Sequence, residues 1–142
     1  MRKKLRLQRS ASVGAASVAV VLTGLSLSHL SHGIHIVTQA SAVECWAMAI
    51  GIDMGFLAAE AAMLCGSTEA VRKKVWRYAG PAIGGTLSMS SALNALAFVS
   101  QALPILPYQV SAAGLGVSIP ALIYALVRIA FVLWTAGGSP EQ

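Results

Sequence analysis

The sequence has little charge, and this scarcity restricts the fold. Only 11% of the 142 residues are charged and 56% are hydrophobic, and the mean hydropathy is +0.72. Soluble domains carry about 25% charged residues. From Ser10 to Val43 there is no Asp, Glu, Lys or Arg. Such a chain cannot cover a water-facing globule with charge, so its apolar residues must face lipid or one another.

Enzyme motifs are absent as well. The chain has no phosphate-binding loop of the GxxxxGK[ST] type, no HExxH zinc motif, no CxxC pair and no GxSxG turn. Its many serines have no histidine or aspartate partner expected at a matching depth in the fold. We predict a non-enzymatic protein that needs no cofactor.

Cysteine is rare, with only Cys45 and Cys65 present. If the residues between them form a helix, a rise of about 1.5 Å per residue separates the two cysteines by roughly 30 Å. A disulfide requires Cα atoms within about 7 Å, so the two cannot pair within one chain. We expect both to be small apolar side chains in packed positions, and an intermolecular bond at Cys45 is the alternative.

Long apolar stretches are what the sequence does have. A helix that crosses a bilayer core needs about 20 predominantly apolar residues, and the chain holds four such stretches. We therefore predict an all-α, polytopic membrane protein, a bundle of four transmembrane helices in a single domain over residues 1–142. The spans are expected at about 11–30, 44–65, 81–103 and 111–134, with a basic loop over 66–80.

The basic residues predict the orientation, because cytoplasmic segments of membrane proteins carry an excess of Lys and Arg. Nine of the ten form two clusters: Arg2, Lys3, Lys4, Arg6, Arg9, and Arg72, Lys73, Lys74, Arg77. Both termini and the loop 66–80 are therefore expected on the cytoplasmic side of a bacterial inner membrane. The second cluster would anchor the loop at the membrane or contact a partner. Direct nucleic-acid binding is disfavoured, since it needs a broader basic surface on a soluble body.

Aromatic residues agree with these span limits. Tyr and Trp gather at membrane–water interfaces. Five of them fall at predicted span ends: Trp46, Trp76, Tyr78, Tyr108 and Trp134.

A cleaved signal peptide is the alternative for the N-terminal part, because Ala40-Ser41-Ala42 resembles a peptidase site. The first apolar stretch is longer than the roughly 7–15 residues of a signal h-region, and this tripeptide lies about ten residues beyond it. We therefore favour an uncleaved first span.

Three charged residues fall inside predicted spans, namely Asp53, Glu60 and Arg128. Each costs about 2.5–3.5 kcal/mol on insertion scales, so such residues mark function or a buried pair. Counted from the inner ends of their spans, Glu60 and Arg128 lie at matching depths. We predict an ion pair between the second and fourth spans; the alternative is that Arg128 extends to the inner headgroups by itself.

Asp53 has no basic residue at its depth. The third span carries a polar stripe on one side of its helix, made of Thr86, Ser90, Asn94 and Gln101. We expect this stripe to hold Asp53, with a hydrogen bond to Asn94. A structural clamp between helices is the first interpretation, and a proton or ion step is the second.

The second span also carries a ridge of small residues at every fourth position: Ala47, Gly51, Gly55 and Ala59. Such ridges let two helix backbones approach closely. The ridge lies opposite the face that holds Asp53 and Glu60. The second span should therefore contact protein on both sides, either as the central helix or at a homo-oligomer interface.

Three histidines, His29, His32 and His35, follow the first span. On a continuing helix they spread over about 120°, which is too broad for one tridentate site, although two of them with Glu44 could approach a metal ion at about 2 Å. We predict a polar collar at the interface and no metal.

Three short motifs stand out: Ser26-Leu27-Ser28-His29-Leu30, Ile52-Asp53-Met54-Gly55, and the run from Gly85-Thr86-Leu87-Ser88 to Asn94. Together they resemble a family of small four-span bacterial membrane proteins that includes plasmid spread proteins of conjugative elements. The resemblance covers about residues 20–100; the family tends to carry a proline before the aspartate, where this chain has Ala49 and Ile50. It implies an accessory role at the transfer apparatus of a mobile element, without catalytic activity.

Overall fold

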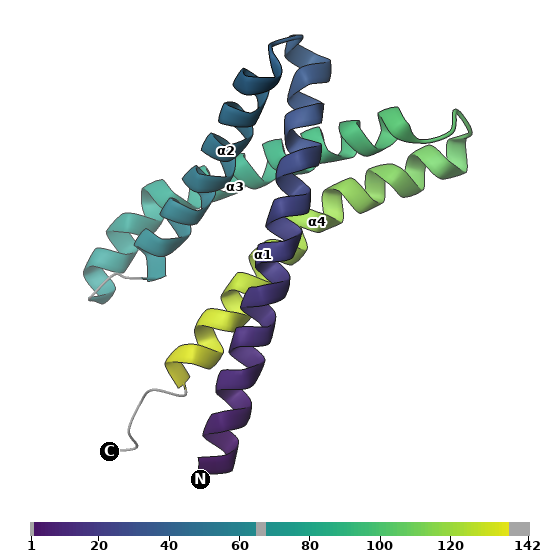
Figure 1. The fold of residues 1–142 in the computed structure, drawn as a ribbon. Helices are drawn as coiled ribbons and strands as arrows, with labels where there is room; N and C mark the ends of the chain where they lie inside the picture. The colour runs from purple at the N-terminus through teal and green to yellow at the C-terminus, as the bar shows by residue number, and fades with distance from the viewer. Residues whose placement is uncertain (1, 65–67, 137–142) are drawn as a thin grey trace.

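The computed structural model describes residues 2–64 and 68–136, and the described chain is all α-helical. Its four helices are α1 (Arg2–Thr38), α2 (Ala42–Leu64), α3 (Glu69–Gln101) and α4 (Leu106–Ala136) (Figure 1). Each is long and apolar enough to cross a membrane. The predicted four-helix architecture is confirmed.

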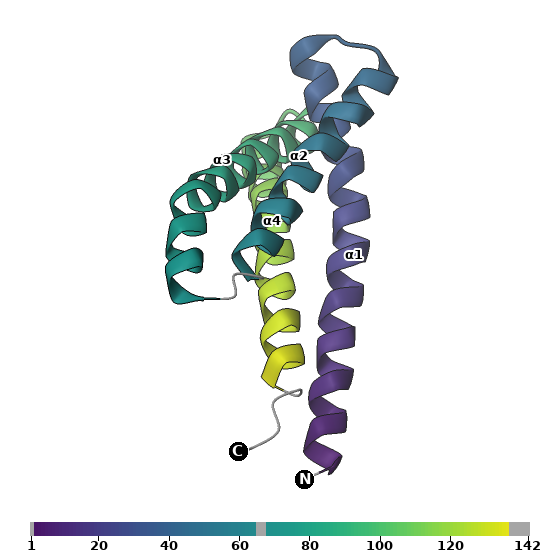
Figure 2. The same cartoon turned by 90° about the vertical axis from the view of Figure 1, so that its left-hand side faces the viewer.

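The helices form two antiparallel hairpins, α1 with α2 and α3 with α4 (Figure 1). The first half of α1 lies beside the last half of α4 in both views (Figures 1 and 2). There, Ser12 Oγ donates a hydrogen bond to the carbonyl oxygen of Ala130 at 2.7 Å. Helices α1 and α3 each pack against the other three helices. Within one chain, then, α2 is not the central helix.

Two helices extend well beyond the predicted spans. Helix α1 continues to Thr38, and α3 begins at Glu69, so the prediction of a loop over 66–80 is wrong for the described residues from 69 onward. Hydropathy marks only the lipid-facing part of a helix, whereas the backbone hydrogen bonds continue into polar sequence. Thr68 caps α3 by accepting a hydrogen bond from the Val71 N–H at 3.3 Å.

Helix α3 changes direction partway along its length (Figure 2). Its proline, Pro81, lies inside the helix. Proline has no N–H to donate and its ring crowds the preceding turn, which bends a helix without necessarily ending it. The two arms of α3 therefore run in different directions, the first carrying the basic cluster and the second packing in the bundle.

The turn between α1 and α2 is short because both helix ends are capped locally. Gln39 adopts a left-handed conformation with φ of 56°, and its N–H donates to His35 O at 2.9 Å. Ser41 and Glu44 form a reciprocal capping box, with Ser41 N–H donating to Glu44 Oε2 at 2.9 Å and Glu44 N–H to Ser41 Oγ at 3.4 Å.

The interior is small and partly polar. One apolar cluster joins α1 to α2 and contains Leu30, Ile34, Cys45 and Ala49. A second lies between α2 and α3 and contains Phe56, Met63, Ala79 and Ile83. Among the described residues, six polar ones are buried with them: Ser12, Ser26, Ser31, Glu60, Ser90 and Asn94. Cys45 thus fills a packed position as predicted, whereas Cys65 lies outside the described residues.

Two glycines allow the closest backbone contacts. A Cβ atom on Gly33 would overlap the carbonyl group of Leu93, and one on Gly116 would overlap the backbone of Ala95. Helix α3 is therefore held between α1 and α4 at the level of Asn94, where no side chain separates the backbones.

Candidate functional site

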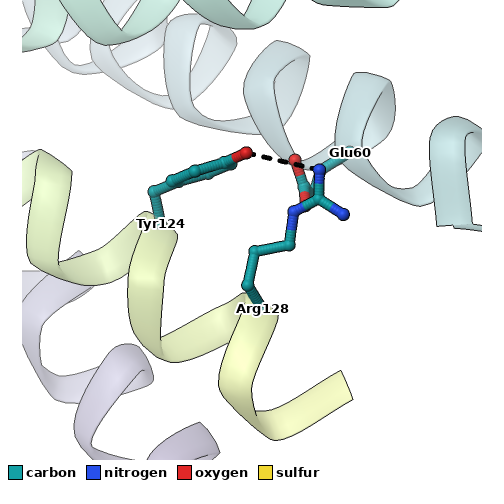
Figure 3. Close-up of polar contacts among 3 residues, drawn as sticks. All are labelled: Glu60, Tyr124 and Arg128. Atoms are coloured by element: carbon teal, nitrogen blue, oxygen red, sulfur yellow. Dashed lines mark hydrogen bonds and ion pairs between the residues drawn. The ribbon is translucent and has the colours of Figure 1, made fainter. Parts of the chain in front are cut away.

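The first polar centre joins α2 to α4 through two charged side chains. Arg128 Nε lies 2.6 Å from Glu60 Oε1 (Figure 3). Glu60 is 1% exposed, whereas the Arg128 side chain is 34% exposed. The structure therefore brings together the two residues whose depths match in the sequence.

Tyr124 completes this centre. Arg128 Nη2 donates a hydrogen bond to Tyr124 Oη at 3.3 Å, and the guanidinium lies 5.5 Å from the centre of the Tyr124 ring. The same ring meets Phe56 of α2 edge-on at 6.1 Å. Glu60 accepts no hydrogen bond from the described residues. The contact between Arg128 and Glu60 is thus an ion pair without a hydrogen bond, and the hydrogen bond to Tyr124 positions the guanidinium.

The second polar centre joins α3 to α1 around Asn94, which is 0% exposed. Asn94 Nδ2 donates to Ser90 O at 2.8 Å and to Ser26 Oγ at 3.1 Å. Its Oδ1 has no hydrogen-bond partner in the described part of the chain. The predicted hydrogen bond from Asp53 to Asn94 is therefore wrong. The amide faces α1 instead, because the close contact at Gly33 brings Ser26 within its range.

Asp53 lies beside this second centre and is half-buried. It lines a cavity of about 20 Å³ whose polar members come from three helices: Thr23 and Ser26 of α1, Asp53 of α2, and Thr86 and Ser90 of α3. That volume holds about one water molecule. Thr23 and Thr86 donate their hydroxyl protons to the carbonyl groups of Ala19 and Ala82, both at 2.8 Å. Their oxygens keep lone pairs to accept a hydrogen bond.

The polar stripe of α3 is only partly shared with Asp53. Thr86 and Ser90 line the same cavity as the carboxylate. Asn94 is turned toward α1, and Gln101 is exposed at the end of α3. In the described residues the stripe does not form one polar path from Asp53 to Gln101.

In the part of the chain that the structure describes, the centre of the small-residue ridge of α2 contacts no other helix. Ala47, Gly51 and Gly55 are exposed, and a Cβ atom on either glycine would meet nothing within 4 Å. Ala59 is half-buried beside the Phe56 cluster. Of the two alternatives for this face, packing within the bundle is wrong, because α2 turns its opposite face toward α1 and α3; the homo-oligomer interface stays a prediction.

The second basic cluster is helical and faces outward. Its four residues are exposed on the first turns of α3: Arg72, Lys73, Lys74 and Arg77. On α1, Arg6 and Arg9 are exposed as well.

The histidines do not converge. His29 is half-buried, with its ring centre 4.1 Å from that of Phe98. His32 is exposed, and His35 Nδ1 lies 2.9 Å from Ala40 O. Among the described residues no three side chains of His, Cys, Asp or Glu lie close enough to share a metal ion.

Sequence reasoning missed Tyr124, Ser26 and Gly116. Tyr124 precedes Arg128 by four residues, a spacing that places both on one helix face. Gly116 belongs to a second small ridge, Ala112-Gly116-Pro120, all of it buried. Ser26 belongs to the motif Ser26-Leu27-Ser28-His29-Leu30, but serine is frequent throughout α1, so the sequence does not mark Ser26 as the partner of Asn94.

Comparisons of the chain with protein-family models, with curated proteins and with solved structures found no match. The chemistry of the residues described above is what bears on its function.

Proposed function

We propose that this chain is a multi-pass protein of the bacterial inner membrane and acts there as a self-associating, non-enzymatic scaffold or accessory protein. The observation that carries the membrane location is the distribution of its side chains. Charged and polar groups such as Glu60 and Asn94 are buried, whereas large apolar side chains along all four helices are exposed, among them Val20, Met54 and Leu122. In water this arrangement would be unstable, and in lipid it is the favourable one.

The aromatic residues support the same location. Trp46, Trp76, Tyr78, Tyr108 and Trp134 are each between 43% and 72% exposed and lie toward helix ends, the position that membrane interfaces favour. With Arg72 to Arg77 in the cytoplasm, the short turns at 39–41 and 102–105 face outward and both termini face inward.

The orientation can be tested by labelling a single cysteine. In a variant with Cys45 and Cys65 replaced by alanine, Ala70→Cys places a thiol at an exposed position on the first turn of α3. A membrane-impermeant maleimide should label it only after the cells are lysed. Labelling in intact cells would show that this end of the bundle faces outward.

The scaffold role is supported by how the interior polar groups are used. Glu60 and Arg128 join α2 to α4, Asn94 joins α3 to α1, and Ser12 joins α1 to α4. Each of these contacts fixes two helices together, and the cavity at Asp53 holds about one water. Self-association is supported by the exposed centre of the α2 ridge.

A small channel or proton-coupled carrier using Asp53 and Glu60 is the second candidate, because the Asp53 cavity gathers a carboxylate and four hydroxyl groups. Vesicles that contain the protein and a pH dye distinguish the two functions. A proton leak in the parent protein that disappears in Asp53→Asn would contradict the scaffold. Under the scaffold proposal neither protein leaks, while both remain folded.

The process in which the scaffold acts is proposed from the resemblance of three short motifs to those of plasmid spread proteins. A host that expresses the chain should then show a changed rate of conjugative plasmid spread through a population, without a change in growth. An unchanged rate in both donor and recipient would contradict this assignment and leave the membrane location unaffected.

A further inference from the structure

A cavity of about 340 Å³ opens at the end of the bundle where α2 ends and α3 begins. It is lined by Met63 and Leu64 of α2, Arg72 and Trp76 of α3, and Arg128 and Phe131 of α4. Its volume lies in the range of ligand sites. Two arginines thus line a cavity whose remaining walls are aromatic and aliphatic, a combination that suits a ligand with one anionic and one apolar part.

Arg128 keeps part of its hydrogen-bonding capacity for this cavity. A guanidinium has five N–H donors. Its Nε lies against Glu60 and its Nη2 donates to Tyr124, whereas the other terminal nitrogen points away from both residues (Figure 3). Because the side chain is one-third exposed and lines the cavity, this nitrogen can donate to a bound oxygen.

The charge of the cavity selects among anions. Of the six lining residues only Arg72 and Arg128 are charged, and Glu60 already balances the charge of Arg128. Arg72 therefore leaves a net charge of about +1. A phosphodiester carries one negative charge and matches it, whereas a phosphate monoester, whose second pKa is about 6, carries nearly two at neutral pH.

We propose that this cavity binds the phosphodiester headgroup of one anionic phospholipid, with Arg72 and Arg128 holding the phosphate oxygens. Met63, Leu64 and Phe131 contact the glycerol backbone and the first carbons of the acyl chains. Trp76 also lines the cavity and is 53% exposed, and tryptophan is enriched at membrane interfaces. Basic pockets between transmembrane helices on the cytoplasmic side are a common form of lipid headgroup site. Such binding presupposes the membrane location proposed above.

The chain supplies a matched control for the test. Arg72 and Lys73 are adjacent, exposed and basic, but only Arg72 lines the cavity. Arg72→Gln and Lys73→Gln therefore remove the same net charge from the same helical turn. Neither side chain is buried, so both variants should keep the helical content of the parent protein.

Native mass spectrometry of the detergent-solubilised protein measures the binding. The parent protein and Lys73→Gln should each retain one phosphatidylglycerol molecule with similar affinity, and Arg72→Gln should bind it about tenfold more weakly. Phosphatidylcholine, whose headgroup has no net charge, should bind weakly to all three. Glycerol phosphate at millimolar concentration should not displace the lipid.

Equal retention of phosphatidylglycerol by Arg72→Gln and Lys73→Gln would overturn the lipid site, as would equal binding of phosphatidylcholine. Displacement by glycerol phosphate would identify a soluble phosphate ligand instead of a lipid and would also overturn it. Release of the parent protein from membranes by alkaline carbonate is a different result, because it would overturn the membrane location itself.

Discussion

Helices α2 and α4 both carry small residues at every fourth position, yet the two ridges are used differently. The α4 ridge consists of Ala112, Gly116 and Pro120. It is buried, and Gly116 touches the backbone of α3. The centre of the α2 ridge is open, with nothing within 4 Å of a Cβ atom built on Gly51 or Gly55. A four-residue repeat of small residues thus shows that a helix has a flat face, but it does not show whether a neighbouring helix covers that face.

The two helices are also attached differently. Helix α4 is held against α3 by direct backbone contact, whereas α2 reaches α4 through the side chains of Glu60, Arg128 and Tyr124. Backbone contact depends on the absence of a side chain, and the ionic contact depends on the presence of two. A substitution at the backbone contact should therefore destabilise the fold by adding a side chain, and a substitution at the ionic contact should destabilise it by removing one.

The largest effect is expected from breaking the ionic contact. Arg128→Leu leaves Glu60 buried without its partner, which should lower the free energy of unfolding by about 3–5 kcal/mol. Unfolding by sodium dodecyl sulfate in mixed micelles measures the change. Adding Glu60→Leu should restore much of the loss, and a double variant as unstable as the sum of the two single variants would show that the residues do not interact.

Filling the buried ridge comes next. Gly116→Leu inserts a side chain where even a Cβ atom overlaps the backbone of Ala95, so α3 and α4 must separate. Overpacking of this kind costs about 1–3 kcal/mol or more. The thermal stability of the detergent-solubilised protein should fall, with Gly114→Leu, on the open side of the same helix, as the control. Equal stability of the two variants would contradict the close contact.

A smaller effect is expected at the neutral polar centre. Ser26→Ala removes the acceptor for Asn94 Nδ2 on α1 but leaves its bond to Ser90 O. Hydrogen bonds between membrane helices average about 0.6 kcal/mol, with a maximum near 1.7. The same unfolding assay should give a loss in that range, well below that of Arg128→Leu. A loss of several kcal/mol would mean that the α1–α3 contact depends on this bond more than on Gly33.

The smallest effect on the single chain is expected at the open ridge. A Cβ atom on Gly51 would meet nothing within 4 Å, so Gly51→Leu should change the free energy of unfolding of the monomer by less than about 0.5 kcal/mol. If the ridge joins two copies, the same variant should abolish disulfide crosslinking between Ala47→Cys chains, whereas Met54→Leu should not. Crosslinking that persists in Gly51→Leu would place the self-association elsewhere.

The number and apolar character of the helices could be predicted because about 20 apolar residues have few other stable arrangements. The ion-pair partner of Glu60 could be predicted from depth alone, since among the basic residues only Arg128 is expected at that level. The ends of the helices were harder to predict. Glu69, Lys73 and Lys74 are good helix formers, but a hydropathy criterion assigns these charged residues to a loop. The partner of Asn94 could not be predicted, because it depends on the rotation of α1 about its axis, which the contact of Gly33 with Leu93 determines.

The exposed apolar side chains have a consequence for how such a fold changes over evolutionary time. Residues such as Val20, Leu115 and Val132 face outward. In the membrane location proposed above they would face lipid, in which one aliphatic side chain dissolves about as well as another. They are free to drift among Leu, Ile, Val and Met, while Gly33, Asn94 and Gly116 are not. Two descendants of one ancestor could then share the fold and only a few small, common residues, so ancestry would be recorded in the interior contacts and largely erased from the outer surface.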